Sequence, residues 1–597
     1  MFLLAAIHPP EVTQALEVSA GEPSSTPATR KGRAKRPEKG DHGAKPPPGV
    51  QHMAFLRSVP LAVILPLLLA TVTLAQEHGG GPSAEEKLGT VSFATSCSAA
   101  ARPLFDRAVA LLHSFEFGPA IAGFNAAVDI DPSCAMAEWG IALSRWGNPF
   151  AAGVRPLAPL QQGRDAVDRA RSIGLKTERE RAYVDAVSQL YARAETIDQR
   201  TRVLAYQDAM ARVAEANPDD TEASIFYALS LAAAASPADK TYADLLKAGA
   251  ILEKLAKSQP DHPGISHYII HSYDVPSLAD RALDAAWCYG KIAPAAPHAL
   301  HMPSHTFTRL GYWQASIDAN IASGAVAKRL GSTAEELHTL DYRTYAYLQT
   351  GQDGAAREIL GALPDVKARF DPDAVASAAP GSAGVFALAA IPARYALERG
   401  AWADAAKLVP EPSDYPYADA LTFFAKALGA ARMGDAAATR SAIDALTTIE
   451  GRLTKKKEAY WAEQTEIQSR SASAWLALVE GRKAEALAEM RVAAAMEDGT
   501  EKSAVTPGPL APARELLGEM LLELDQPADA LKEFEGTLEK EPNRFRALFG
   551  AARSASLAGD PEKARMYSVA LLKICDGADK PGRPALDQAR RMASSQQ

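Results

Sequence analysis

One spacing of small, aromatic and proline residues recurs in this chain, and it limits the possible folds more than any other feature. The spacing occurs at Ala530, Phe534 and Pro542, and again at Ala120, Phe124 and Pro132. Leu517, Gly518 and Leu521 precede the first of these sets, and Ala564, followed by Tyr567, lies 34 residues after Ala530. Small residues let two helices approach closely, and proline cannot continue a helix. The spacing therefore predicts helical hairpins repeated along the chain.

These intervals resemble the tetratricopeptide repeat (TPR). The resemblance implies an all-α fold, a TPR-like solenoid of helical hairpins with partly degenerate repeats, from about residue 96 to the C-terminus. Five glycines are expected to end the first helix of a hairpin: Gly311, Gly351, Gly400, Gly434 and Gly481. No segment alternates apolar and polar residues for long enough to predict a strand. Such stacks present a concave surface, and the resemblance implies a protein or peptide ligand there.

The N-terminal part of the chain has a different composition. Residues 1–52 hold eight prolines and a mixed charge run, and they are expected to be a disordered extension or an over-extended gene start before Met53. Residues 53–75 combine Arg57, an apolar run and small residues at Thr73 and Ala75, which is typical of a secretory signal peptide. The apolar run is short for a membrane span, so the alternative, an uncleaved anchor, is less favoured. We therefore expect a periplasmic or secreted protein without stable membrane insertion after cleavage.

The rest of the chain is predicted to form a linker and two helical regions. The linker covers residues 76–95, an N-terminal TPR-like helical domain covers 96–370, and a C-terminal TPR array covers 385–597. A stretch rich in Pro, Gly, Ala and Ser at 371–384 is the expected break between the two arrays.

The four cysteines fit an oxidising compartment. Cys97 and Cys134 flank one predicted helical hairpin, so we expect a disulfide between them. Cys288 and Cys575 fall at apolar positions of predicted helices and are expected to be buried thiols. The sequence has no CxxCH or CxxC, so it predicts neither c-type haem nor a thiolate zinc site.

Charge and motifs exclude several functions. Lys and Arg number 64 against 72 Asp and Glu, a net charge of −8, so the chain lacks the basic excess that nucleic-acid binding requires. It has no GxxxxGK[ST] phosphate loop, so no nucleotide cofactor is expected, and no HExxH or GxSxG motif of a protease or serine hydrolase.

Histidines are concentrated in one window. The chain holds twelve, and an even distribution would place about one in residues 262–305. This window holds six: His262, His267, His271, His298, His301 and His305. His267 and His271 are four apart on a predicted helix and so share one face, and that helix is expected to end near Asp274. His301 is expected in a loop before Pro303, with His305 just inside the next helix. The two pairs lie 34 residues, or one repeat, apart, so the four imidazoles are expected to converge on one point.

Neutral imidazole is a ligand for zinc, copper, iron and nickel, so the window predicts a divalent transition-metal centre built from its six histidines. Hydrogen-bond partners for the ligands are expected among Asp274, Asp341, Tyr268, Tyr273 and His338, and Met302 is a softer candidate ligand. The alternative is a hydrogen-bonded polar core, in which His113 and His338 serve packing and His262 and His298 cap helices. Trp139, Trp146, Asn148 and Phe150 are expected to pack hairpins rather than line a ligand pocket.

A second resemblance is more specific. The stretches CAMAEWGIALSRWGNPF (134–150), HPGISHYIIHSYD (262–274) and HALHMPSHTFTRLGYW (298–313) are similar to a group of large secreted bacterial TPR proteins. The resemblance implies the fold and the compartment but supplies no reaction. The sequence thus predicts an exported scaffold or binding protein with a histidine metal centre. The alternatives are a metal-dependent periplasmic enzyme, hydrolase or oxidoreductase, and a scaffold whose histidines only form hydrogen bonds.

Overall fold

A computed structural model describes residues 86–375 and 377–594. The expected extension (1–52), the signal peptide (53–75) and residues 76–85 of the linker lie outside this range. Every regular element in the described residues is a helix, and no strand occurs among them, so the all-α prediction is confirmed. No helix in the same ranges combines the length and the apolar character that a membrane crossing requires.

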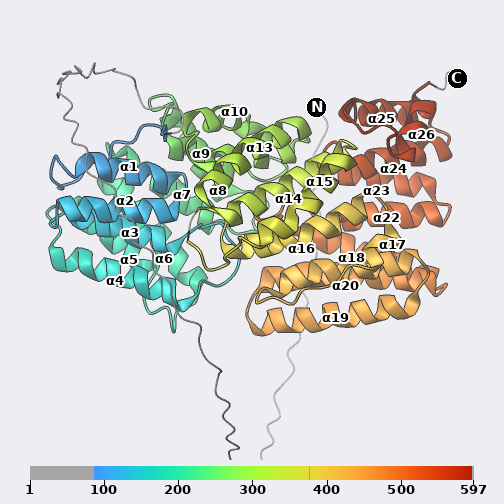
Figure 1. Ribbon diagram of the computed structural model, residues 1–597, viewed down its shortest axis with the longest axis horizontal. Helices are drawn as coiled ribbons and strands as arrows, with labels where there is room; N and C mark the ends of the chain where they lie inside the picture. Colours follow the sequence, from blue (N-terminus) through green and yellow to red (C-terminus); the bar gives the residue numbers. More distant parts are fainter. Residues whose placement is uncertain (1–85, 376, 595–597) are drawn as a thin grey trace, which may run out of the picture. The chain divides into compact units, whose positions relative to one another are not determined.

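The first helices form consecutive antiparallel hairpins (Figure 1). Their bounds are α1 (Arg102–His113), α2 (Phe117–Ile130), α3 (Ala135–Trp146), α4 (Leu157–Ile173), α5 (Glu178–Gln189), α6 (Gln199–Ala216), α7 (Thr221–Ala234) and α8 (Ala243–Ala256). Each helix packs on the next one in the chain, as in a stack of hairpins.

The central part of the chain contains shorter helices. They are α9 (Pro263–Ser272), the 3-10 turn η1 (Ala279–Ala282), α10 (Leu283–Ile292), α11 (Pro297–His301) and α12 (Pro303–Arg309), followed by the longer α13 (Trp313–Leu330), α14 (Thr333–Gln349) and α15 (Asp353–Lys367). Prolines at the first position of α9, α11 and α12 start these helices where their missing N–H costs no hydrogen bond.

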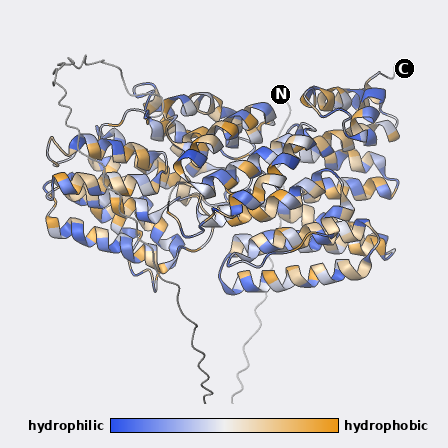
Figure 2. Cartoon of the chain, viewed as in Figure 1, coloured by the Kyte–Doolittle hydropathy of each residue, from blue (hydrophilic) through white to orange (hydrophobic). Residues whose placement is uncertain are grey.

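The C-terminal helices resume the regular pairing. They are α16 (Gly381–Glu398), α17 (Trp402–Ala406), α18 (Pro416–Arg432), α19 (Ala436–Lys455), α20 (Ala459–Val479), α21 (Lys483–Gly499), α22 (Ala513–Glu523), α23 (Pro527–Lys540), α24 (Phe545–Leu557), α25 (Pro561–Ile574) and α26 (Pro584–Ser594). Hydrophobic and hydrophilic residues alternate around most of these helices (Figure 2), which is how each buries one face against its neighbours.

The recurring spacing corresponds to one packing arrangement. The buried Phe534 ring of α23 lies between two glycines, and an added Cβ would approach it to 2.9 Å at Gly518 and 2.4 Å at Gly550. Phe124 of α2 lies against Gly140 in the same way, with 2.3 Å to an added Cβ. The two ends of the chain therefore use the same close contact between helices, with no room for a side chain at the glycine.

The five predicted turn glycines also occupy the expected conformation. Gly311, Gly351, Gly400, Gly434 and Gly481 have φ between 64° and 80°, and a helix begins two residues after each. A left-handed residue that ends one helix and leads into the next is the arrangement that the repeat predicts.

The cysteines follow the prediction with one exception. Cys97 and Cys134 form a disulfide, with Cα atoms 4.6 Å apart, and Cys575 is buried. Cys288 is exposed, so the prediction of a buried thiol there was wrong. Helix α10 buries the face that carries Ala285, Tyr289 and Ile292, and Cys288 lies with Trp287 on its solvent side.

Candidate metal centre

Helix α9 carries the first two histidines of the centre on one face. Gly264 in its first turn is required because an added Cβ would lie 2.4 Å from His113 Nδ1. This close approach brings the end of α1 onto α9. His267 and His271, one turn apart, are both buried and their ring centroids are 4.8 Å apart.

Together with His298 of α11 these residues form what we call the first histidine set. One ring nitrogen from each of the three lies within 4.8 Å of the other two. Geometry then requires a point within about 2.8 Å of all three nitrogens, whereas zinc binds imidazole at about 2.0–2.1 Å, so ring shifts below about 1 Å would complete the coordination.

Hydrogen bonds orient two rings of this set. His267 Nδ1 donates to the carbonyl oxygen of His113 (2.6 Å), and His298 Nδ1 lies 3.2 Å from a carboxylate oxygen of Glu335. The Nε2 atoms of His267, His271 and His298 are buried and have no hydrogen-bond partner among the described residues. A ring held through Nδ1 with its Nε2 lone pair free is the usual state of a metal-ligating histidine.

Aromatic rings pack against the set, and its burial keeps the imidazoles neutral. Phe115 packs against His267 at 4.4 Å between centroids, and Phe150 stacks on His271 at 3.9 Å. Burial lowers the pKa of His267, His271 and His298 well below the usual value. All three are therefore neutral at pH 7, the form that binds metal ions.

Two buried carboxyl groups lie beside the first set. Glu116 accepts from the backbone N–H of His298 (3.3 Å) and from Ser377 Oγ (3.1 Å), and Glu335 accepts from the backbone N–H of Ala379 (3.0 Å). Burial, and then the proximity of Glu335, raises the pKa of Glu116 to about 8, and burial also raises the pKa of Glu335. A divalent cation in the set would favour the ionised form of both carboxyl groups and so lower their pKa.

Three further histidines form a second histidine set: His301, His305 and His338. One ring nitrogen from each lies within 4.8 Å of the other two. His301 Nε2 and His305 Nε2 are 3.1 Å apart, and the Tyr342 hydroxyl lies 3.3 Å from His305 Nε2. Burial lowers the pKa of His301 to about 3, and it also lowers the pKa of His305 and of His338.

Asp274 connects the second set to positively charged side chains. His305 Nδ1 donates to Asp274 Oδ2 (2.9 Å), Arg309 Nε donates to Oδ1 (2.9 Å), and Lys502 Nζ lies 3.5 Å from Oδ1. Burial alone would raise the pKa of Asp274, but Lys502, Arg309 and the bond from His305 hold it well below its usual range. Asp274 thus contacts His305, one of the histidines predicted to bind a metal ion.

A third group of potential ligands is joined by hydrogen bonds to Glu222, and within it His262 Nδ1 is the ring nitrogen that is buried without a partner among the described residues. Glu222 accepts from His113 Nε2 (2.9 Å) and from His262 Nε2 (3.0 Å), and the other nitrogen of His113 lies 3.0 Å from the Tyr268 hydroxyl. The structure therefore places His262 and Tyr268 in this Glu222 group, apart from both histidine sets. Here the hydrogen-bonded polar core, the alternative interpretation of the window, describes the contacts better.

The other predicted site residues lie elsewhere. Asp341 is paired with Arg394 (3.0 Å), and the Tyr273 hydroxyl donates to Glu253 (2.7 Å). His301 is the last residue of α11, so the expected loop position was wrong: Pro297 starts a short helix that includes it. The expected convergence of four imidazoles on one point is replaced by two adjacent sets.

A pocket of about 510 Å³, part of it open to solvent, reaches both sets. Its lining includes His271, His298, His305 and His338, together with Met302 and Asn148. A ligand that enters this pocket can therefore approach either set. Asn148 was expected to pack between hairpins, but it lines this pocket. Trp139 packs as expected and is buried among Phe93, Tyr183 and Phe226.

Sequence analysis did not find the carboxylates Glu116, Glu222 and Glu335 or the amide of Asn320, which accepts from His301 Nδ1 (2.7 Å). Glu335 had a local signal, because it lies three residues before His338 and both are buried on α14. Glu116 and Glu222 come from hairpins far from the histidine window, and a single sequence gives no sign of these contacts.

Comparisons with known proteins add little to this description. No protein-family model and no curated protein matches the sequence. The chain is similar to three solved structures: "YrrB: a TPR protein with an unusual peptide-binding site" (19% identity over 34% of this chain and 90% of that chain, TM-score 0.18), the P58(IPK) TPR domain (13%, 83% and 98%, 0.20), and Naa15/Naa10 bound to HypK-THB (12%, 82% and 90%, 0.22). At these TM-scores the fold assignment rests on the chain's own helix packing.

Proposed function

We propose that this helical-repeat protein binds a divalent transition-metal ion in the first histidine set. The observation that carries the proposal is the three buried Nε2 atoms of His267, His271 and His298, which lack hydrogen-bond partners within the described part of the chain. A buried, unpartnered polar atom costs roughly 1–3 kcal/mol, and three of them, on rings that each bring a nitrogen within 4.8 Å of the other two, are explained together by a shared ligand.

The donor chemistry narrows the choice of metal. Imidazole nitrogens suit zinc, copper, iron and nickel, whereas calcium and magnesium prefer oxygen ligands. An ion bound here would connect α9 with α11 and, through the contact of His298 with Glu335, with α14. Its binding free energy would add to the stability of a region built from short helices.

The test is equilibrium binding of Zn²⁺ or Co²⁺ to the purified full chain after removal of metals with a chelator. We expect stoichiometric binding to the wild type and at least a tenfold weaker first site in His271→Ala. His262→Gln is the matched control, because His262 bonds Glu222 instead of joining either set, and it should bind as the wild type does. A wild type that binds neither ion would refute the proposal.

A second candidate function is metal-dependent catalysis by a periplasmic hydrolase or oxidoreductase. The pocket favours it, because His271, His298, His305 and His338 line a space that a substrate can enter. A three-nitrogen site leaves a coordination position for water, which is the arrangement of catalytic zinc sites. Turnover of ester or phosphoester substrates, or of oxygen with a reductant, by the metal-loaded protein and its loss in His271→Ala would support this candidate.

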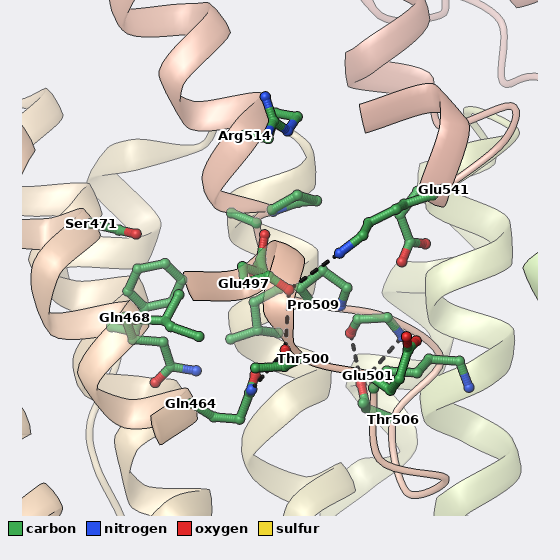
Figure 3. A pocket seen from close by; sticks show the side chains of 18 of the residues that line it. Gln464, Gln468, Ser471, Glu497, Thr500, Glu501, Thr506, Pro509, Arg514 and Glu541 are labelled. Carbon is green, nitrogen blue, oxygen red and sulfur yellow. Dashed lines mark hydrogen bonds between the residues drawn. The ribbon is translucent and has the colours of Figure 1, made fainter. Parts of the chain in front are cut away.

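For the predicted protein or peptide partner we propose a second pocket, which adjoins the one beside the histidines and shares Tyr417 and Trp461 with it. It lies among α18, α20, α22, α23 and the segment 500–512, and its lining mixes aromatic side chains such as Tyr417 and Trp461 with polar ones. Figure 3 shows Glu497, Thr500 and Glu541 among the polar side chains. Cross-linking from a photoreactive residue at Gln464 tests whether a peptide occupies this pocket, and an unlabelled pocket would count against it.

Export to the periplasm or beyond the cell remains part of the proposal. It is supported by the signal-like residues 53–75 and by the Cys97–Cys134 disulfide, since disulfides persist mainly in oxidising compartments. The mature protein is expected to begin at Gln76. N-terminal sequencing of the native protein checks this, and a start before residue 76 would contradict cleavage.

A further inference from the structure

In the second histidine set, hydrogen bonds place the ring protons of His301 and His305 on Nδ1, so that the lone pairs on their Nε2 atoms face each other. On one side, His305 Nδ1 donates to Asp274, because a carboxylate that also receives Arg309 Nε can only accept. The proton of neutral His305 is therefore on Nδ1, and its Nε2 carries the lone pair.

The same holds for His301. Its Nδ1 lies 2.7 Å from Asn320 Oδ1, and Asn320 Nδ2 donates to the carbonyl oxygen of Ser316 (2.8 Å). This second bond fixes the orientation of the Asn320 amide, so that its oxygen faces His301 and accepts. His301 therefore also carries its proton on Nδ1.

Two lone pairs at Nε2 consequently lie 3.1 Å apart. They repel each other unless a metal ion or a proton lies between them, and the Tyr342 hydroxyl, 3.3 Å from His305 Nε2, approaches only one of the two nitrogens. Two nitrogens bound to one ion at about 2.0–2.1 Å with an angle of 90–109° are about 2.8–3.4 Å apart, so the separation suits two neighbouring ligands of a metal ion. His338 supplies a third buried ring, whose Nδ1 has no hydrogen-bond partner in residues 86–375 and 377–594.

We infer that His301, His305 and His338 hold a second transition-metal ion, so that the chain carries a two-ion centre. The two sets adjoin: His298 and His301 share α11 with ring centroids 5.8 Å apart, and the centroids of His271 and His305 are 6.2 Å apart. Both sets reach the same pocket, so a ligand there contacts both ions. This inference rests on the proposed metal binding at the first set and extends it.

The experiment counts bound ions. The full chain is freed of metal, loaded with Zn²⁺ or Cu²⁺, passed through a desalting column and assayed for metal per chain. We expect two ions in the wild type, one in His271→Ala, one in His338→Ala and two in the control His262→Gln. In the Cu²⁺ form, electron paramagnetic resonance should show a coupled, broadened signal for the wild type and an isolated-ion signal for each single-set variant.

The outcomes separate the two proposals. If the wild type binds one ion, and that ion is lost in His271→Ala but kept in His338→Ala, the second site is overturned and the first remains. A proton shared between His301 and His305 would then explain the short distance between their Nε2 atoms. No bound ion would overturn both proposals. Circular dichroism of the metal-free variants establishes whether each is folded. If His338→Ala does not fold, His301→Gln, which also removes an Nε2 ligand of the second set, repeats the test.

Discussion

At the scale of single residues, a hydrogen bond at Nδ1 decides the position of the ring proton in four of the histidines. His267 is held by a carbonyl oxygen, His298 by Glu335, His301 by Asn320 and His305 by Asp274, and each of these contacts is made through Nδ1 and leaves Nε2 available for another partner. His262, in contrast, forms a hydrogen bond to Glu222 through Nε2. The proposed ligand histidines therefore differ from His262 in their neighbours, because each has two further imidazole rings beside it where His262 has Glu222 and His113.

The first prediction concerns Glu335, which contacts His298. Glu335→Gln removes the negative charge that makes His298 a stronger donor to a metal ion, so Zn²⁺ affinity should fall about 10-fold or more. Glu336→Gln is the matched control, because Glu336 pairs with Arg369 (2.9 Å). Competition with a chromophoric chelator measures both affinities, and equal affinities in the two variants would contradict the role of Glu335.

The pairing of His267 with His271 could be predicted from the sequence because it depends only on helical periodicity within α9. The division into two sets could not, since it depends on where α11 ends and α12 begins and on His338 arriving from α14. His262 belongs to neither set because it bonds Glu222, which lies 40 residues earlier in another hairpin. Contacts between hairpins leave no periodic signal in a single sequence.

At the scale of the elements, the repeat is defined by an aromatic ring of one helix against a glycine of another. Phe124 with Gly140 and Phe534 with Gly550 have the same sequence separation and the same contact. The spacing and the turn glycines predicted this part of the fold, because both are local requirements of a helical hairpin. The short helices α9 to α12 depart from the repeat, and the two histidine sets are built largely from them, with His338 coming from α14.

The second prediction tests that contact at both ends of the chain. Gly550→Ala and Gly140→Ala place a methyl group within 2.4 Å of a buried phenylalanine ring, so each should lower the free energy of unfolding by about 1–3 kcal/mol. Gly361→Ala in α15 is the control, since nothing lies within 4 Å of its added Cβ, and it should be neutral or stabilising by up to about 1 kcal/mol. Chemical denaturation measures all three, and a neutral Gly550→Ala would refute the shared packing.

The third prediction concerns pH and the junction of α21 with α22. Glu497 accepts from the backbone N–H of Ala513 (2.7 Å), and burial raises its pKa to about 7, with Lys540 acting in the opposite direction and Glu541 and Asp498 adding to the rise. The folded state thus binds this proton more tightly than the unfolded state does. Its contribution to stability is complete below the unfolded pKa of about 4.5 and is lost as the pH rises through about 7.

Denaturation at several pH values between 5 and 8 tests the third prediction by the difference between wild type and Glu497→Gln. Gln keeps an acceptor for Ala513 but does not titrate, so this difference should shrink or change sign toward high pH, by at most about 1.4 kcal/mol per pH unit. A difference that does not vary with pH would mean that Glu497 has an ordinary pKa.

At the scale of the whole molecule, the histidine sets lie where one hydrophobic core gives way to the next. The first core includes Tyr268, Ala299 and Met302, and the following one includes Leu337 and Tyr345 of α14. A metal ion bound between α9, α11, α12 and α14 would join these two cores. Metal binding by these histidines would therefore affect the stability of the fold as well as its chemistry.

The fourth prediction follows from this position. A chelator should lower the melting temperature of the metal-loaded wild type, because an ion at 100 times its Kd contributes about 2.7 kcal/mol to the folded state. The same chelator should leave the melting temperature of a His271→Ala/His338→Ala double variant unchanged. Calorimetry measures both, and an equal effect on the two proteins would place the chelator's action elsewhere.

The most direct test of the central claim is X-ray absorption spectroscopy at the zinc edge of the full chain loaded with Zn²⁺. The structure predicts a first shell dominated by nitrogen at about 2.0–2.1 Å, with the outer-shell scattering of at least three imidazole rings for each ion. A first shell of oxygen with one imidazole or none would show that the ion sits at surface carboxylates, and it would contradict metal binding by the histidine sets.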